Sequence, residues 1–114
     1  MKRSIIAILL ALAPSYAFAA QAVLTWTNAV DNRITATQIE RKDAACTAGG
    51  TFVSTGSVAS GVATFTDTTV AEGATYCYRA RHAAGATSFS DYSNTAQITI
   101  AVTPINPPSN LTVQ

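Results

Sequence analysis

Short stretches in which apolar and polar side chains alternate recur along most of the chain, and this period of two constrains the fold more than any other feature. Strands are predicted at residues 23–26, 34–41, 52–58, 63–66, 75–81 and 96–102. Turn-forming pairs such as Gly49-Gly50, Ser60-Gly61 and Glu72-Gly73 separate them. No window of the chain after residue 20 repeats apolar residues with a helical spacing. Six short strands spaced in this way predict an all-β sandwich whose two inner faces pack together.

The first 19 residues have the layout of a secretory signal peptide. Lys2 and Arg3 precede an apolar run at residues 5–13, and Ala17 and Ala19 are the small residues that a signal peptidase reads. The alternative, an uncleaved membrane anchor, is disfavoured because the run is much shorter than the roughly 20 residues that cross a bilayer. We therefore expect cleavage after Ala19, an exported periplasmic or extracellular product, and no membrane span after cleavage.

Charge and length limit the partners of the exported chain. With 114 residues, of which 11% are charged, the sequence is long enough for one small domain. Without Lys2 and Arg3, five of the seven basic residues remain against six acidic ones, a net charge of −1. No electrostatic attraction to a polyanion is expected, so nucleic acid is not an expected partner.

The two cysteines, Cys46 and Cys77, are predicted to form a disulfide. An even number of cysteines in an oxidising compartment is used most simply in this way. A metal or redox role is the alternative, but two cysteines and the single His82 are too few ligands for a metal site, and no Cys-x-x-Cys motif is present. No metal and no cofactor are expected.

Residues 65–94, FTDTTVAEGATYCYRARHAAGATSFSDYSN, resemble the region from strand E to strand G of a fibronectin type III domain. The shared pattern is an aromatic residue, an Asp two positions on, a Val or Leu, a Gly, and then Tyr-x-Tyr-Arg. The sequence LTW at 24–26 is similar to strand B of that family, and ITATQIERK at 34–42 is similar to its strand C. The resemblance covers residues 22–102 and implies a fibronectin type III (immunoglobulin-like) β-sandwich over residues 20–103.

The resemblance also implies roles for single residues. Tyr76 would form the tyrosine corner, in which a buried ring bonds the backbone near the E to F turn, and Trp26 would be the core tryptophan. Cys77 would face away from the core, so that its bridge to Cys46 would cross the outer face of one sheet. Thr37 departs from the aromatic residue usual at its position.

Counted against the seven strands of the family, strand A is missing from the front of the chain, since residues 20–22 lead directly into strand B. The Pro-rich tail at 104–114 resembles a strand A instead, with Leu111 and Val113 on one side. Three explanations remain open. The tail folds back into its own vacancy; the chain is one module of a tandem array; or the tail enters the groove of another copy as a donor strand.

Catalysis is not expected. A catalytic triad needs a base beside an activated nucleophile in a cleft, and His82, Ser88, Ser90 and Asp91 instead fall at the end of strand F and in the loop before strand G.

The aromatic residues left for the surface are Phe52, Phe89 and Tyr92, the last two expected over the open end of the sandwich. Arg79 and Arg81 are expected on a solvated face with cross-strand partners such as Glu40.

The sequence and its resemblance thus predict a secreted, non-catalytic fibronectin type III module of the bacterial type, with a structural or protein-interaction role. The alternatives are a filament subunit joined by donor-strand exchange of the tail, and an accessory carbohydrate-binding module of an extracellular enzyme system, which exposed aromatic side chains would favour.

Overall fold

The computed structural model describes residues 19–114, so the predicted signal peptide lies outside the described residues except for Ala19. Residues Ala20–Val102 form one compact unit, and the segment Thr103–Gln114 falls outside that unit. The described residues contain strands and turns but no helix, and accordingly no helix there is long and apolar enough to cross a membrane. The predicted all-β class is confirmed.

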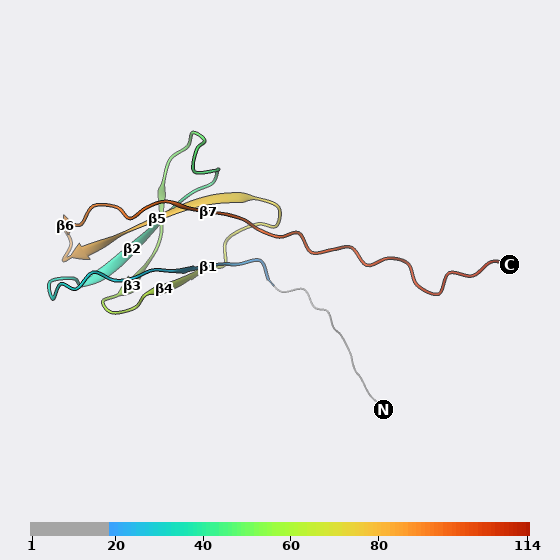
Figure 1. Cartoon of the computed structure of the whole chain (residues 1–114), viewed down its shortest axis with the longest axis horizontal. Coiled ribbons are helices and arrows are strands. Elements are labelled where there is room, and N and C mark those ends of the chain that lie inside the picture. The colour runs from blue at the N-terminus through green and yellow to red at the C-terminus, as the bar shows by residue number, and fades with distance from the viewer. Residues whose placement is uncertain (1–18) are drawn as a thin grey trace, which may run out of the picture. The chain divides into compact units, whose positions relative to one another are not determined.

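The compact unit is a sandwich of two sheets (Figure 1). One sheet pairs β1 with β4, and the other has the order β3-β2-β5, with β6 and β7 each pairing with β5. All pairings are antiparallel. The strands are β1 (Ala22–Thr25), β2 (Ala36–Lys42), β3 (Val53–Ala59), β4 (Thr64–Asp67), β5 (Thr75–Ala84), β6 (Ser88–Phe89) and β7 (Ala96–Thr99).

In fibronectin type III terms, β1 and β4 correspond to strands B and E, and β2, β5 and β7 correspond to C, F and G. Among residues 19–114, no strand pairs with the other edge of β1, which is where strand A would lie. The two-stranded sheet is therefore open along β1.

The core lies between the two sheets and follows the alternation of the strands. Ile39 of β2 and the rings of Tyr76 and Tyr78 of β5 are buried, and Ala22 meets them from β1. Leu24, Trp26 and Phe65 pack against this cluster but are only partly buried. Gly56 of β3 lies under the Phe65 ring, because a Cβ at this position would come within 2.5 Å of the ring. The absence of a side chain at residue 56 lets the ring of the facing sheet approach the backbone closely.

Strand ends differ from the sequence prediction where side chains bind the backbone. β2 begins at Ala36 rather than residue 34, because Asp31 accepts hydrogen bonds from the Arg33 and Ile34 N–H groups and holds the chain in a turn. β5 continues to Ala84, three residues further than predicted, because its last residues pair with β6, a short strand that the alternation did not predict.

Candidate functional site

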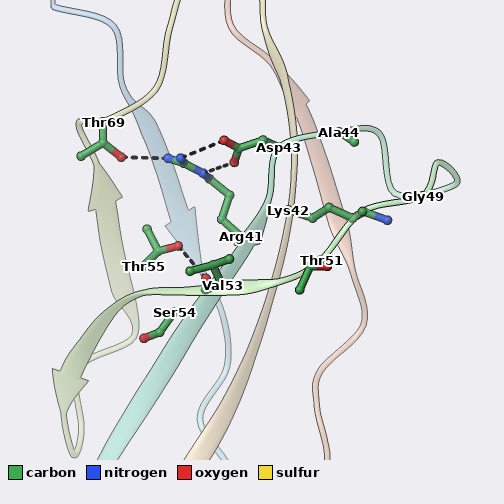
Figure 2. Close-up of a pocket in the computed structure, with 11 residues that line it drawn as sticks. Arg41, Lys42, Asp43, Ala44, Gly49, Thr51, Val53, Ser54, Thr55 and Thr69 are labelled. Carbon is green, nitrogen blue, oxygen red and sulfur yellow. Dashed lines mark hydrogen bonds and ion pairs between the residues drawn. The ribbon is translucent and has the colours of Figure 1, made fainter.

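A polar hollow of about 540 Å³ lies where β2 ends and β3 begins (Figure 2). Its cations are already bound by the protein. The Arg41 Nε donates to Asp43 at 2.7 Å, and the Lys42 Nζ donates to the carbonyl oxygens of Cys46 and Ala48 at 3.1 and 2.7 Å. Charged groups with their hydrogen bonds made inside the protein give an incoming anion little to bind. This hollow is therefore a structural feature of the β2–β3 loop.

Asp67 bonds two residues that line this hollow, Arg41 and Thr69, and is the centre of a buried polar network. Its carboxylate is 2% exposed and accepts hydrogen bonds from the Tyr78 hydroxyl at 2.7 Å, the Arg41 Nη1 at 2.9 Å and the Thr69 hydroxyl at 2.6 Å. Burial alone would raise the pKa of Asp67, but hydrogen bonds from Thr69, Tyr78 and Arg41 outweigh burial and lower the pKa to about 2. Burial, with the hydrogen bond to Asp67, raises the pKa of Tyr78 well above its usual range. The network connects β2, β4 and β5.

A second hollow, of about 360 Å³, follows the open edge of β1, and we call it the β1 groove. One wall is formed by the inward side chains of β1 and the residue after it, and the other wall by inward positions of β5 and β7. The residues that define the groove are Ala22, Leu24, Trp26, Tyr78, Ala96 and Ile98. Ile98 faces Tyr76 across the β5–β7 pair, on the core side of its sheet, and yet it is 37% exposed. The groove thus exposes apolar side chains that a neighbouring strand would cover.

The backbone at the groove's edge is free to pair. The Trp26 N–H donates to the Ala63 carbonyl at 3.1 Å, on the side of β4. Because N–H and C=O groups alternate in direction along an antiparallel strand, those of Val23 and Thr25 point toward the open edge. β3 is also an edge strand, but its register shifts between Ile39 and Glu40, and a bulge of this kind blunts an edge. β4, β6 and β7 also pair on one side only, and of these β7 lines the same apolar hollow as β1. The edge of β1 is the one at which a further strand would extend the two-stranded sheet.

A smaller hollow of about 300 Å³ continues the groove past Trp26 and shares Trp26, Ala80 and Ser93 with it. Thr37, which is buried, contacts the Nδ1 atom of His82 at 2.9 Å, and the Ala29 N–H donates to Nε2 at 3.2 Å. Since Nε2 accepts, Nδ1 carries the proton and donates to the threonine. A Thr–His pair therefore occupies the layer where the family resemblance led us to expect an aromatic ring.

The residues singled out for catalysis do not form a triad. Both ring nitrogens of His82 are used by Thr37 and Ala29, whereas Ser90 bonds the backbone: its Oγ accepts from the His82 N–H and donates to the Asp91 carbonyl. No hydrogen bond joins the imidazole to the Ser90 hydroxyl among the described residues. The loop serine thus fastens the segment between β6 and β7 to β5.

The predicted disulfide forms between Cys46, in the β2–β3 loop, and Cys77 of β5. Cys77 lies between Lys42 and Gln97 in register and is fully buried, on the outer side of the five-stranded sheet. The loop itself covers it, since the Cys46 N–H donates to the Gln97 Oε1 at 2.8 Å.

Tyr76 and Trp26, the two residues to which the resemblance assigns roles, differ in how deeply they are buried. Tyr76 is buried, and its hydroxyl accepts a hydrogen bond from the Ala71 N–H at 2.8 Å, the geometry of a tyrosine corner. Trp26 is half-buried, and its Nε1 donates to Asn28 at 2.7 Å. Trp26 therefore borders the β1 groove instead of being enclosed by the core.

Phe89 and Tyr92 do not pack over the open end of the sandwich. Together with Phe52, their rings contact the guanidinium groups of Arg79 and Arg81, the outward arginines of β5. The Arg79 guanidinium lies 4.1 Å from the Phe52 centroid and 3.6 Å from that of Tyr92, and Arg81 lies 3.9 Å from Phe89. A guanidinium on an aromatic face is a favourable contact, and Phe89 and Tyr92 remain 40% and 37% exposed. The expected cross-strand pair is present, with Arg79 Nε donating to Glu40 at 2.8 Å.

Leu111 and Val113, the candidate donor residues, lie in the tail, which has no strand of its own. Their side chains are 91% and 97% exposed.

Comparison with known proteins supports the fold. No family model and no curated protein matches the sequence. The twitchin kinase region from C. elegans (Fn31-NL-kin-CRD-Ig26) is similar in structure, with a TM-score of 0.61 and 19% identity over 74% of this chain and 14% of that one. A second structure, described as "Myokine structure", has a TM-score of 0.55 and 14% identity over 74% of this chain and 85% of that one. The chain spans only a small part of the twitchin region. At these identities the likeness shows a fibronectin type III or immunoglobulin-like sandwich and nothing of function.

Proposed function

We propose that this chain is an exported, non-catalytic module of the bacterial fibronectin type III kind, which binds an extended protein segment by strand addition at the β1 edge. The partner contributes a strand that pairs with the free N–H and C=O groups of Val23 and Thr25 and places alternate apolar side chains in the β1 groove. Strand addition of this kind takes its affinity from main-chain hydrogen bonds and its specificity from the alternate pockets.

The observation that carries the proposal is the coincidence of a regular unpaired edge with an exposed apolar hollow. Leu24, Trp26 and Ile98 belong to inward positions but are only partly covered. An antiparallel strand beside β1 would cover them and would satisfy the edge at the same time. In the hollow at the β2–β3 loop and in the one beside His82, charged and polar side chains are bonded within the protein, so they leave fewer groups for a partner.

Export is supported by the predicted signal peptide and by the Cys46–Cys77 disulfide, since such bonds persist in oxidising compartments. The non-catalytic role is supported by the use of His82 and Ser90 in hydrogen bonds that fasten loops and strands.

The proposal is tested by selecting phage-displayed linear peptides of about nine residues against the protein lacking its first 19 residues. Selected peptides are then measured against two variants. Thr25→Pro removes one edge N–H, and an edge strand tolerates proline where that group faces solvent. Thr25→Val is the matched control, because it changes the side chain and keeps the N–H.

We expect selected peptides to bind the wild type and Thr25→Val alike and to lose about tenfold or more in affinity for Thr25→Pro, roughly the effect of a lost hydrogen bond at a desolvated edge. Amide chemical shifts should move at Val23 and Thr25. Enrichment of no peptide, equal binding to the proline variant, or shifts confined to other strands would each overturn strand addition at β1.

A further inference from the structure

We infer that the segment that fills the β1 groove is the tail at residues 107–114 of a second copy of this chain. The inference rests on the proposed function and names its partner. Copies would then join head to tail, with each copy giving its tail to one neighbour and receiving a tail from the other.

The tail has the pattern of a strand without a sheet. Leu111 and Val113 are two residues apart and almost fully exposed, and Thr112 and Gln114 alternate with them. Two aliphatic side chains left in water on one side of an extended segment are stabilised by any apolar surface that covers them. The preceding Pro107 and Pro108 have no N–H groups, so the segment before Leu111 can donate few backbone hydrogen bonds to a neighbouring strand.

Spacing and charge match the tail to the groove. Inward residues of β1 lie two apart, like Leu111 and Val113, so in both strands neighbouring inward side chains are separated by about 6 to 7 Å. Residues 104–114 contain no charged side chain. Among the described residues that line the groove, Arg79 alone is charged, and it is bonded to Glu40. Burial of the tail would therefore leave no side-chain charge without a partner.

The direction of the strands favours a second copy over the chain's own tail. β1 begins opposite Asp67, near the turn that precedes β5, and the chain leaves β7 at the same end, where the Gly73 N–H donates to the Ile100 carbonyl. A strand antiparallel to β1 must enter at the other end, beside Trp26. To pair antiparallel with β1, the chain's own tail would have to run the length of the groove before turning into it. If it entered directly, it would lie parallel to β1, which is the slightly less stable pairing, whereas the tail of another copy enters beside Trp26 in the antiparallel direction.

Such a contact uses two different surfaces of each copy, so it does not close on itself as a twofold dimer does. Heterologous contacts extend into open chains unless the rotation between copies closes a ring. Assembly should therefore grow with concentration in steps of one subunit.

The first experiment measures mass by sedimentation velocity over a wide range of concentration, using the protein without residues 1–19. Wild type should show a ladder of species that lengthens with concentration. Leu111→Asp with Val113→Asp should stay a monomer, because it puts charges into the groove. Thr112→Asp with Gln114→Asp is the matched control, with the same charge on the outward side, and should assemble like the wild type.

The second experiment fixes direction and register by cross-linking. One copy carries Thr25→Cys and the Leu111→Asp/Val113→Asp tail, so that it only accepts. The other copy, of different mass, carries Thr112→Cys. Oxidation should link the two copies, whereas an acceptor with Ser57→Cys, an exposed position on the other sheet, should remain unlinked.

The outcomes separate this inference from the proposed function. A wild type that stays monomeric, with library peptides still bound at the β1 edge, overturns the tail as the occupant and leaves strand addition standing. Failure of the library peptides as well overturns both. A monomer in which Thr25→Cys and Thr112→Cys of the same chain cross-link overturns the second copy in favour of self-insertion.

Discussion

Asp67→Asn should lower stability by an amount that shrinks as the solution is acidified. At neutral pH the substitution removes the charge that accepts hydrogen bonds from Tyr78, Arg41 and Thr69 in a buried site. Removing one partner of a buried ion pair costs about 3 to 5 kcal/mol, because the other is left uncompensated. Arg41 keeps Asp43 as a second partner, so we expect the lower end of this range, about 3 kcal/mol.

The pH dependence follows from the lowered pKa. A carboxyl whose pKa falls from an ordinary 3.8 to about 2 on folding stabilises the folded state above the unfolded value, and it loses this contribution as the pH falls through the folded one. At about 1.4 kcal/mol for each pH unit of difference, the full contribution is about 2 kcal/mol. About half of it should be lost by pH 3 and most of it by pH 2.

The assay is urea unfolding of wild type and Asp67→Asn at pH 7, 5, 3 and 2. Asp31→Asn is the control, because the Asp31 carboxylate bonds Arg33 at the surface, where an ion pair contributes little. The difference between wild type and Asp67→Asn should narrow by about 2 kcal/mol between pH 7 and pH 2. If the difference in unfolding free energy between wild type and Asp67→Asn stayed constant over this range, Asp67 would titrate alike in the folded and unfolded states. That result would refute the hydrogen-bond network as the cause of a lowered pKa.

Three further substitutions test other contacts. Cys77→Ala opens the disulfide and should lower stability by about 2 to 5 kcal/mol, measured by thermal or urea unfolding; an unchanged midpoint would mean that the bridge does not constrain the unfolded chain. Tyr76→Phe leaves a backbone N–H without its acceptor and should cost about 1 to 3 kcal/mol, and a wild-type urea midpoint would contradict the tyrosine corner. Gly56→Ala drives a Cβ into the Phe65 ring and should cost about 1 to 3 kcal/mol, whereas Gly49→Ala meets no neighbouring atom and should be nearly neutral; equal effects of the two would exclude the close approach.

Apart from β6, the strands of the described residues could be read from the sequence because they are short, alternate in polarity and are bounded by turn residues. Their ends could not be read from the alternation, because Asp31 and its neighbours decide where β2 begins through side-chain bonds to the backbone. The disulfide followed from the number of cysteines alone. Asp67 stood in the motif on which the family resemblance rested, but the motif gave no sign that Arg41, 26 residues earlier, would reach it.

The aromatic surface shows a different limit of sequence reasoning. Alternation placed Arg79 and Arg81 outward, as observed, but it carried no information on which loops would fold over them. Tyr92 reaches Arg79 because the serines around it bond the backbone of β5: the Ala80 N–H donates to Ser93 Oγ at 3.0 Å. Loop position was decided by these side-chain to backbone bonds, which no period in the sequence reports.

The disulfide, the Asp67 network and the tyrosine corner include no residue of β1, and this distribution bears on how the groove could accept a strand. The disulfide, the Asp67 network and the tyrosine corner join β2, β4 and β5, while β1 contributes four residues paired with β4 alone. A strand added at the β1 edge would therefore complete the two-stranded sheet without displacing any of these contacts. Since a two-stranded ribbon is marginally stable by itself, the added strand should stabilise β1 most. Amide hydrogen exchange should accordingly slow at Leu24 and Trp26 when the groove is filled and change little at Tyr78; protection that rises equally at all three would indicate a general stabilisation instead of strand addition.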